Sequence, residues 1–572
     1  MGEIPAKSPR GQSRLYPGKI TSPHDYKSGH GSHAFSSPRL ALFSLIMSCS
    51  KPETSAEKPA QIEHVDGVQD TSLETTVSSQ GAINTLLILA CVAFGSASFV
   101  FGFDDKIISP LAALPEFVRD FQGPNPVDGT LVFTARNQNL IFSVPLVGSI
   151  VGGVLASPLN NNFGRKWPLI GAYFFSIGGG FLQLFARNIA EFVIGRFLNA
   201  IAIGVANATA PLYLSEVVPP SMRGRSVTSI NILSLLAGVI STIIVNETKD
   251  IQGKLEYQIP LAVQCALPAL ILVATIPLPE SPQWLVSKGR IEEAHCNLRK
   301  LRGYSDIQVA DELRVMQQCE ENERALTANV RFYEIFDRQN LKRTLTGGAF
   351  YSLNQISGII LSTTYTTVFL TQLGVGDAFT FTVIASCCTL AGTIVAPFVI
   401  DRVGRRPTAF VGMTILLLID IAAGGLAFKT SNKDFVMGIA ALGFIFNFFW
   451  GAGFYSLSAL MPSEIATPKL RNHTMAYTIA CAQTSAVITT FAVPQLTSAD
   501  AANLGAKTYL VFAGCMVCVL VFVYFCMPET KGRTFAEIDE MYDAKIPMWK
   551  WRDYQTSTAA KPGAKGKNES VV

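Results

Sequence analysis

Twelve long apolar runs constrain this chain more than any other feature of its sequence. A helix needs about twenty apolar residues to cross the hydrocarbon core of a bilayer, and each run is close to that length. Most runs contain no charge; Arg196 and Asp420 are the exceptions inside a run, and Asp104 closes the first. We therefore predict an all-α integral membrane protein with twelve transmembrane helices. The runs are 83–103, 140–159, 167–186, 192–213, 227–245, 260–278, 345–370, 378–400, 407–428, 435–461, 473–496 and 509–527.

The composition agrees with this class of protein. Of the 572 residues, 49% are hydrophobic and only 15% are charged, whereas a soluble protein of this length usually carries more charge. The net charge of +4 is small, and no basic stripe interleaved with aromatic residues indicates a nucleic-acid surface. The sequence also lacks a nucleophile–base set, a metal-ligand cluster and a phosphate-binding loop. We expect a lipid bilayer around the chain, and no nucleic-acid partner, metal, cofactor or enzyme activity.

The polar segments divide the runs six and six. The long segment 279–343 has apolar residues at helical spacing among charges, which is typical of an amphipathic surface helix, and residues 1–80 have a disorder-like composition. The expected regions are a disordered cytoplasmic tail at 1–80, a six-helix bundle at 81–278, a cytoplasmic helical linker at 279–343, a second six-helix bundle at 344–527 and a cytoplasmic tail at 528–572.

Lysines and arginines near the runs set the expected orientation, because cytoplasmic loops carry more of them. With both termini inside, the short inner loops hold nine and the outer loops eight, which decides little. The segment 279–343 adds eleven to the inner side and decides the orientation. We expect a plasma-membrane protein with both termini in the cytoplasm.

Three short motifs occur twice in the same order, which indicates a duplicated six-helix unit. Two parallel repeats of this kind describe the halves of the major facilitator fold, in which the solute site lies between the halves near the middle of the bilayer. The matching motifs are Gly164-Arg165-Lys166 with Gly404-Arg405-Arg406, Glu216 and Arg223 with Glu464 and Arg471, and Pro279-Glu280 with Pro528-Glu529.

These repeated charges lie at the inner ends of the runs, where arginines and carboxylates can pair. Pairs that form when the inner side closes and break when it opens would act as a cytoplasmic gate. The alternative is that the arginines only follow the bias toward positive inner loops. The predicted gate residues are Asn161, Arg165, Glu216, Arg223, Glu280, Asp401, Arg405, Glu464, Arg471 and Glu529.

The sequence resembles the sugar porters of the major facilitator superfamily, in their fungal branch. The motifs that carry the resemblance run through residues 82–545. They are Gly-Phe-Asp at 102–104, Gly-Arg at 195–196, Pro211-Leu-Tyr-Leu-Ser-Glu216, Arg223-Gly224, Pro279-Glu-Ser-Pro-Gln-Trp-Leu285, Asp401-Arg-Val-Gly-Arg-Arg406 and Pro528-Glu-Thr-Lys-Gly532. The resemblance implies a secondary transporter that moves a sugar or related polyol by alternating access, as a monomer.

The chain departs from the family at positions that the resemblance assigns to the gate and the solute. Asn161 stands where the family has Asp, and an amide cannot form the ion pair, so we expect a weaker first-half gate. Polar residues for sugar hydroxyls are fewer and shorter, and one position of the seventh run is apolar. The residues that we expect to bind substrate are Asn231, Asn354, Gln355, Ile360, Trp450 and Tyr455.

Asp104 and Arg196 are the expected proton-coupling residues. Asp104 lies about 30 Å along the first run and Arg196 about one turn into the fourth, so both fall in the outer half of the membrane. Ionisable groups at that depth are expensive unless paired and often mark ion pathways. By resemblance, Asp104 accepts the proton and Arg196 modulates it, with Lys106 able to bind a nearby carboxylate. The alternative is that Asp104 caps a helix end and Arg196 reaches the outer surface.

Two further residues and two further functions stay open. Asn246-Glu-Thr fits an N-glycosylation site in an outer loop, and Asp420 either faces solvent-filled space or pairs with another residue. The departures from the family also allow a transporter or exporter of another organic solute, such as a fungal secondary metabolite or a quinate-like acid. A nutrient sensor is disfavoured, because only about 45 residues follow Pro528.

Overall fold

The structure is a computed structural model that describes residues 85–127, 129–303, 305–327, 331–429, 432–554 and 556, except for some side chains, among them those of 220–229. Within these ranges every regular element is a helix. Residues 1–80, for which we predict disorder, lie outside the described part.

Six long helices form the first bundle, and each matches one predicted run. They are α2 (Thr85–Ala113), α4 (Ala135–Phe163), α5 (Lys166–Leu184), α6 (Ile189–Val217), α7 (Pro220–Thr248) and α8 (Leu255–Thr275). A short helix, α3 (Pro115–Phe121), follows α2.

The second bundle also has six spans, but two of them are interrupted. The seventh span consists of α12 (Leu341–Ile356), the π-helical segment η2 (Ile360–Thr364) and α13 (Thr366–Gln372). The tenth consists of α16 (Lys433–Phe449), the π-helical segment η4 (Trp450–Tyr455) and α17 (Ser456–Ile465). The uninterrupted spans are α14 (Ala378–Val403), α15 (Arg405–Leu426), α18 (Arg471–Thr497) and α19 (Thr508–Cys526).

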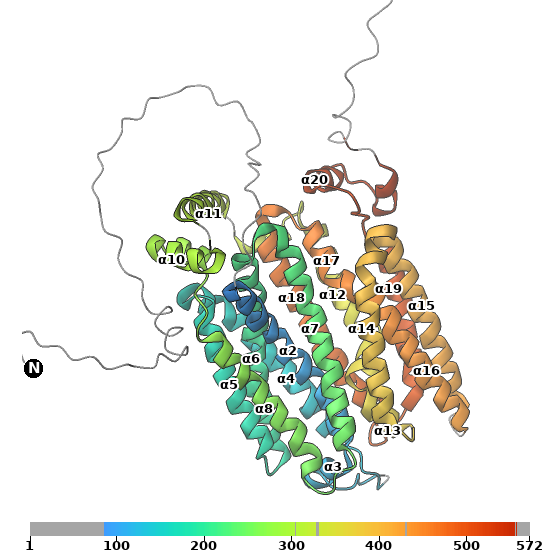
Figure 1. The fold of residues 1–572 in the computed structure, drawn as a ribbon. Coiled ribbons are helices and arrows are strands. Elements are labelled where there is room, and N and C mark those ends of the chain that lie inside the picture. The colour runs from blue at the N-terminus through green and yellow to red at the C-terminus, as the bar shows by residue number, and fades with distance from the viewer. Residues whose placement is uncertain are drawn as a thin grey trace, which may run out of the picture. The chain divides into compact units, whose positions relative to one another are not determined.

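The smaller elements define the two ends of the bundles (Figure 1). We call the end that carries α9 (Pro282–Ser287), α10 (Ile291–Arg302), α11 (Asp306–Thr327) and α20 (Phe535–Asp543) the linker face, and the end that carries α3 the distal face. The 3₁₀ segments are η1 (Phe332–Phe336), η3 (Ala427–Lys429), η5 (Pro468–Leu470), η6 (Gly505–Lys507) and η7 (Met548–Asp553).

The two bundles pack in the same way, which confirms the duplicated unit predicted from the motifs. Span pairs 1 and 5, 2 and 4, and 3 and 6 touch in the first bundle, as α2 with α7, α4 with α6, and α5 with α8. The equivalent pairs touch in the second bundle, as α12 with α18, α14 with α16 and η4, and α15 with α19. The bundles meet where α4 contacts α18 and α7 contacts α14.

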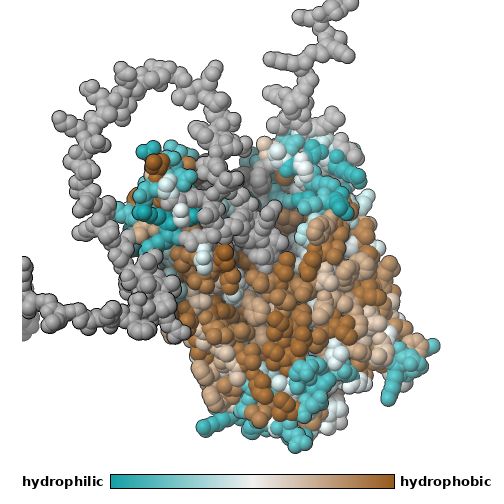
Figure 2. Space-filling model, in the orientation of Figure 1, coloured by the Kyte–Doolittle hydropathy of each residue, from teal (hydrophilic) through white to brown (hydrophobic). Residues whose placement is uncertain are grey.

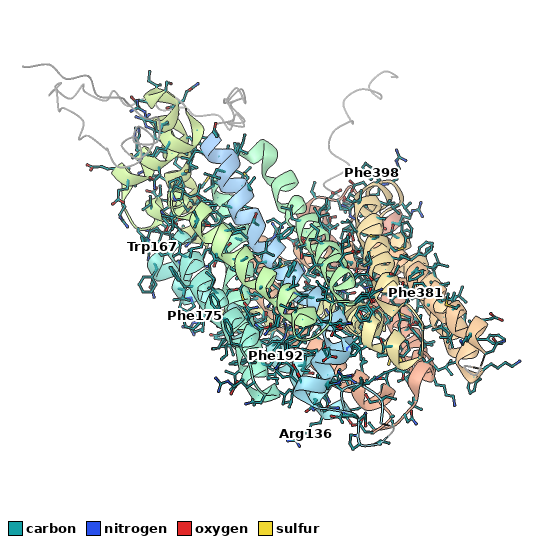
Figure 3. All side chains as sticks on the ribbon, turned by 60° about the horizontal axis from the view of Figure 1, so that its bottom comes forward. Arg136, Trp167, Phe175, Phe192, Phe381 and Phe398 are labelled. Atoms are coloured by element: carbon teal, nitrogen blue, oxygen red, sulfur yellow. The ribbon has the colours of Figure 1, made fainter. Side chains whose placement is uncertain are left out.

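On the face shown in Figure 2, an apolar belt covers the helices between two polar ends. Ten of the described helices are long and apolar enough to cross a membrane; α5, whose glycines lower its mean hydropathy, and the interrupted seventh span complete the twelve. Large apolar side chains such as Trp167, Phe175 and Phe398 are exposed on the outside of the bundles (Figure 3). Because lipid would cover this surface, its exposure fits a membrane-spanning protein.

Glycines set the closest helix approaches. A Cβ atom at Gly152 of α4 would lie 2.1 Å from the carbonyl oxygen of Ile201 in α6, and one at Gly392 of α14 would lie 2.2 Å from that of Phe448 in α16. The two glycines occupy the same place in the two repeats. Without a strong hydrophobic force between helices in lipid, small residues let backbones approach and pack.

One span boundary differs from the prediction in a way that matters below. We expect the first span to end at residue 103, but α2 continues to Ala113. The charges of Asp104 and Asp105 suggested an end, yet the following residues Ile107, Ile108 and Leu111 are buried and continue the apolar face. Tertiary burial therefore overrides the local charge signal.

The Gly152 contact yields a first prediction. In G152A the new methyl group meets the Ile201 carbonyl, so we expect α4 and α6 to separate and stability to fall by about 1–3 kcal/mol. G153A is the matched control, because a Cβ at Gly153 has open space within 4 Å and alanine favours a helix by about 1 kcal/mol. Thermal unfolding of both purified variants in detergent measures the difference; equal stability of the two would contradict the proposed contact.

Candidate functional site

Asp104 is the centre of a buried polar cluster in the first bundle. Three donors address its Oδ1 atom: Asn199 Nδ2 at 2.7 Å, Gln264 Nε2 at 2.5 Å and Arg196 Nη1 at 3.4 Å. Asp104 comes from α2, Arg196 and Asn199 from α6, and Gln264 from α8. Helix packing thus places one carboxylate among a cation and two amides, in the way that a charge inside an apolar bundle requires.

The structure removes the alternative reading of Asp104 and Arg196. Asp104 lies inside α2, with roughly 14 Å of helix beyond it, so it caps no helix end. Arg196 is 5% exposed and does not reach the outer surface. Its Nε atom is buried without a hydrogen-bond partner among the described residues, so the contact with Asp104 leaves part of the guanidinium free. Whether the two residues couple protons stays a prediction.

Lys106 pairs with Asp105 rather than with Asp104. Its Nζ atom lies 3.3 Å from Asp105 Oδ2, and its stem packs on α7, where a Cβ atom at Gly238 would lie 2.7 Å from Lys106 Cγ. Gly238 therefore makes room for the Lys106 side chain. The described partners of Asp104 are therefore Arg196 and the amides of Asn199 and Gln264.

The sequence analysis missed Asn199 and Gln264. Both are single amides inside apolar runs, and their spacing from Arg196 offers one usable signal: Asn199 follows Arg196 by three residues, which places both on one helix face. Gln264 lies on another helix, and only the packing of α2 against α8 brings it to the carboxylate.

A second polar cluster lies in the second bundle and contains three of the predicted substrate residues. Trp450 Nε1 donates to Asn354 Oδ1 at 2.9 Å, and the rings of Trp450 and Tyr455 lie 4.9 Å apart. Trp450 and Tyr455 are the first and last residues of η4, and Asn354 lies in the last turn of α12. Asn354 is thus held by an aromatic residue from the tenth span.

The other three predicted substrate residues are less closely joined to this cluster. Ile360 is buried at the start of η2, and Gln355 is half-buried in α12. Asn231 is exposed on α7, and the described hydrogen bonds do not connect it to Asn354 or Trp450. Both π-helical segments therefore carry predicted substrate residues, and such segments are frequent at functional sites.

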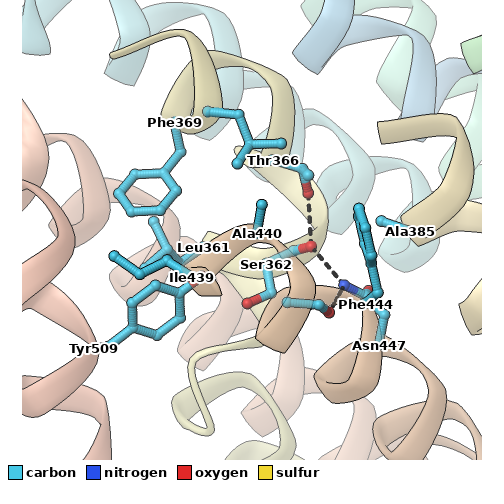
Figure 4. Close-up of a pocket in the computed structure, with 12 residues that line it drawn as sticks. Leu361, Ser362, Thr366, Phe369, Ala385, Ile439, Ala440, Phe444, Asn447 and Tyr509 are labelled. Atoms are coloured by element: carbon cyan, nitrogen blue, oxygen red, sulfur yellow. Dashed lines mark hydrogen bonds between the residues drawn. The ribbon is translucent and has the colours of Figure 1, made fainter. Parts of the chain in front are cut away.

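A small cavity lies beside η2, between the seventh, eighth, tenth and twelfth spans (Figure 4). Its volume is about 20 Å³, enough for one water molecule. The Ser362 carbonyl accepts hydrogen bonds from Thr366 Oγ1 at 2.6 Å and Asn447 Nδ2 at 3.1 Å. The Ser362 hydroxyl is buried beside the Tyr509 side chain, which lines the same cavity, so a water here would add a hydrogen bond to it.

Asp420 fits neither of the alternatives considered for it. It is fully buried in α15, and neither carboxyl oxygen has a hydrogen-bond partner in the part of the chain that the structure describes. It lies beside the interruption of the seventh span, where Gly358 has a φ of 86° and a Cβ atom would lie 3.7 Å from Asp420 Oδ2.

The predicted gate residues form one network in each half at the linker face. In the first half, Arg165 Nη2 lies 2.7 Å from Glu216 Oε1, and the Arg165 backbone N–H donates to Glu280 Oε1 at 2.8 Å. The Ser281 hydroxyl donates to Glu216. Glu280 thus closes the N-terminus of α5, and Glu216 holds the arginine that precedes it.

The second half repeats this network atom for atom. Arg405 Nη2 lies 3.0 Å from Glu464 Oε1, the Arg405 backbone N–H donates to Glu529 Oε1 at 3.1 Å, and Thr530 Oγ1 donates to Glu464 Oε2 at 2.5 Å. Asp401 adds a contact of 3.6 Å with Arg405 Nη1, but its side chain is 75% exposed.

Asn161 stands in the first half at the position of Asp401, so the first half lacks only the contact between this carboxylate and the arginine. Its side chain is exposed, and Arg165 Nη1 instead donates to the Asn160 carbonyl at 2.8 Å. Of the remaining gate residues, the side chain of Arg223 lies outside the described part, and Arg471 begins α18. The role of the set as a gate stays a prediction.

Burial raises the pKa of the Glu280 carboxyl above its ordinary value, while hydrogen bonds from the backbone N–H groups of Ser281 and Arg165 oppose the shift. The folded chain therefore holds this proton more tightly than the unfolded chain does. The contribution of Glu280 to stability is then largest in acid and is lost as the pH rises through its folded-state pKa.

The described hydrogen bonds between the bundles lie toward the distal face. The backbone N–H of Ala135 donates to Asp500 Oδ2 at 2.9 Å, and Lys249 Nζ lies 2.9 Å from Asp377 Oδ1. This bond from Lys249 holds the pKa of Asp377 below its usual value. The charge networks of the linker face, in contrast, join residues of one half.

Two parallel six-helix bundles with a polar cluster in each define a secondary transporter of the major facilitator fold. Comparisons with known proteins agree with this class. A model of the family described as "Sugar (and other) transporter" matches residues 88–542, which is most of the chain. The chain therefore belongs to this family, as the motif resemblance predicted.

Similar proteins come from fungi and bacteria. The "Major facilitator-type transporter ecdD" of Aspergillus rugulosus is 31% identical, over 82% of this chain and 89% of its own length. The "General alpha-glucoside permease" of Saccharomyces cerevisiae is 30% identical, over 82% of this chain and 76% of its own length. The structure of the proton:xylose symporter XylE of E. coli, bound to 6-bromo-6-deoxy-D-glucose, has a TM-score of 0.62 at 19% identity. The match covers 81% of this chain and 100% of the XylE chain. These relatives are transporters, as expected for a chain without enzyme motifs.

The charge networks of Arg165 and Arg405 at the linker face generate a second prediction. R165Q leaves the buried Glu216 carboxylate without its cation, so we expect stability to fall by about 2–3 kcal/mol. D401N removes only an exposed and long contact, so we expect less than about 1 kcal/mol. Unfolding of both variants in detergent, followed by tryptophan fluorescence, compares them; a larger loss in D401N than in R165Q would contradict this ranking.

Proposed function

We propose that this protein is a proton-coupled transporter that moves a sugar or related polyol across the plasma membrane as a monomer. The observation that carries the proposal is the Asp104 cluster, a carboxyl enclosed in a helical bundle beside an arginine that it only partly engages. Such groups inside a membrane protein typically lie on ion pathways. The XylE neighbour, named as a proton:xylose symporter, shares the fold.

The chemistry of the cluster supports proton transfer at Asp104. All three described donors point to Oδ1, so a proton on Oδ2 leaves these contacts in place. Protonation removes the negative charge and with it the attraction to Arg196. Arg196 can then shift toward other partners, which links the proton to the packing of α6 against α2.

The second bundle supplies groups suited to a sugar. The indole of Trp450, stacked near Tyr455 and fixed by Asn354, offers an aromatic face with an amide beside it, and sugar sites combine such groups. Among the relatives, the alpha-glucoside permease is named for a sugar. A less polar organic solute is the competing substrate class that the sequence left open, and these relatives do not favour it.

The linker face is proposed to be cytoplasmic, since it carries the basic segment 279–343. Asn246 then lies on the outer side, near the end of α7. Its Oδ1 atom accepts hydrogen bonds from Lys249 Nζ at 3.1 Å and Thr380 Oγ1 at 3.2 Å. A glycan on Asn246 would compete with these contacts, so glycosylation remains a prediction that a glycosidase-induced mass shift tests.

Asp104 gives a third prediction, on coupling. D104N is expected to lose accumulation of substrate against its gradient but to keep substrate exchange, because the amide cannot take up a proton yet preserves the shape of the site. Proteoliposomes with an imposed proton gradient measure accumulation, and counterflow without a gradient measures exchange. Substrates are first chosen by uptake across hexoses, pentoses, disaccharides, polyols and quinate in a transporter-deficient yeast.

D105N is the matched control, since Asp105 pairs with Lys106 outside the Asp104 cluster, and it should retain accumulation. Undiminished accumulation in D104N would refute proton coupling at this residue. Uptake of quinate alone, with no sugar or polyol, would refute the proposed substrate class.

Trp450 gives a fourth prediction, on substrate binding. W450F removes the hydrogen bond to Asn354 and shortens the aromatic face, so we expect the KM for the transported sugar to rise about tenfold, as loss of one buried hydrogen bond implies. W167F, at an exposed tryptophan of α5, should leave KM unchanged. Initial rates of labelled uptake measure both; a KM of W450F equal to that of the wild type would exclude Trp450 from the site.

A further inference from the structure

A basic hollow of about 580 Å³ lies at the linker face, between the end of α14 and the segment around α20. Four cations line it, Arg402, Lys531, Arg533 and Arg552, together with two carboxylates, Glu529 and Glu537. The proposed transport mechanism uses none of the four cations.

Both carboxylates already accept hydrogen bonds from backbone N–H groups. Glu529 accepts hydrogen bonds from the N–H groups of Arg405, Arg406 and Lys531 at 3.0–3.1 Å. Glu537 accepts from the Thr534 N–H at 2.7 Å and from Thr556 Oγ1 at 2.8 Å, and these bonds hold the pKa of Glu537 below its usual value. Because their oxygens are occupied in this way, neither carboxylate neutralises Arg402, Lys531 or Arg552.

Three of the four cations, Lys531, Arg402 and Arg552, form no described ion pair, and Arg533 has only a long one. Lys531 Nζ donates to the Arg402 carbonyl at 2.7 Å, and Arg533 Nη2 donates to the Tyr554 carbonyl at 2.6 Å, with Glu537 3.7 Å from its Nη1. The side chains of Arg402 and Arg552 are exposed and form no described ion pair. The hollow therefore has an uncompensated positive charge and two guanidinium groups free to bind an anion.

The internal repeat shows that this hollow is specific to the second half. In the first half Trp284, four residues after Glu280, is buried and donates from Nε1 to the Asn161 carbonyl at 3.2 Å. The residue four positions after Glu529 is Arg533, and Asn162 of the first half corresponds to Arg402. The same place in the fold is thus filled by an indole in one half and left open and basic in the other.

The border of the hollow is apolar on the side of the membrane-spanning helices. Val403 lines the hollow at the end of α14 and is exposed, and Phe398, five residues earlier in the same helix, is also exposed (Figure 3). Trp549 of η7 is exposed and packs 5.9 Å from the Phe525 ring at the end of α19. The polar cap over α20 meets the apolar belt at this level (Figure 2). Basic groups beside an apolar, lipid-covered surface favour a ligand with a charged head and an acyl tail.

We propose that this hollow binds the headgroup of an anionic phospholipid from the adjacent leaflet. Arg402 and Arg552 contact its phosphate, Arg533 adds positive charge, and the acyl chains lie along Val403 and Phe398. Arginine is suited to this role because its guanidinium binds phosphate through two parallel hydrogen bonds.

Native mass spectrometry of the full chain in detergent tests the proposal, with dioctanoyl phosphatidylinositol 4-phosphate as the probe. The wild type should bind one molecule, and R402Q/R552Q should raise its Kd at least about tenfold, since each lost bond is charge-assisted. The control K288Q/K342Q removes the same charge from exposed lysines of the linker face outside the hollow and should change Kd less than about twofold.

Two further ligands separate the possible sources of the anion. Dioctanoyl phosphatidylcholine should not displace the probe, and inositol 1,4-bisphosphate, which lacks acyl chains, should compete weakly. Equal Kd values in the two double variants would overturn the site, and tight binding of the soluble bisphosphate would overturn the lipid assignment. R552Q alone, at an exposed side chain of η7, repeats the test if the double variant fails to fold. Because the readout is binding, its result is independent of whether the chain couples protons.

Discussion

The hydrogen bonds that Glu280 and Glu529 accept from the starts of α5 and α15 organise the linker face of both bundles. Each carboxylate belongs to the segment that follows the sixth span of its half, and each binds the helix that begins the third span. One interaction therefore ties together the two spans that also pack against each other, α5 with α8 and α15 with α19. Because the free N–H groups of a helix start need acceptors, these ends would otherwise be unsatisfied.

Arg165 and Arg405 extend this interaction to a third span. Each arginine lies directly at the helix start that the carboxylate closes, and its side chain reaches the glutamate at the end of the fourth or tenth span. Three spans of each half are thus joined at the linker face. The described networks stay within one half, so each stabilises the packing of its own bundle, and the role of these residues as a gate stays a prediction.

Much of this architecture could be predicted from the sequence, because it depends on local composition. Twelve apolar runs fix twelve spans, and the duplicated Gly-Arg, Glu and Pro-Glu motifs fix the two halves. The end of α2 could not be predicted, since Asp104 and Asp105 look like a membrane boundary until burial of Ile107 and Leu111 is known. Asn199 and Gln264 were missed for a related reason: an isolated amide in an apolar run shows no function until packing brings it to a carboxylate. Asn231 was assigned by family position; it is exposed on α7, and the described hydrogen bonds do not join it to Asn354.

The two halves have kept the same frame but carry different chemistry. The first bundle encloses Asp104 with a cation and amides, while the second presents Trp450, Tyr455 and Asn354 at the breaks of the seventh and tenth spans. The π-helical segments η2 and η4 replace the regular α-helical hydrogen bonds at these two places, and such segments are frequent at functional sites. If the first bundle holds the proton and the second holds the solute, coupling must pass through the contacts between the bundles, which include those of α2 with η2 and α13. The Thr367 backbone N–H, which donates to Ser109 Oγ at 3.1 Å, lies on this route, since Ser109 follows Asp104 in α2 by little more than one turn. A small rotation of α2 on protonation of Asp104 would therefore move Ser109 and change its contact with Thr367 in the interrupted seventh span.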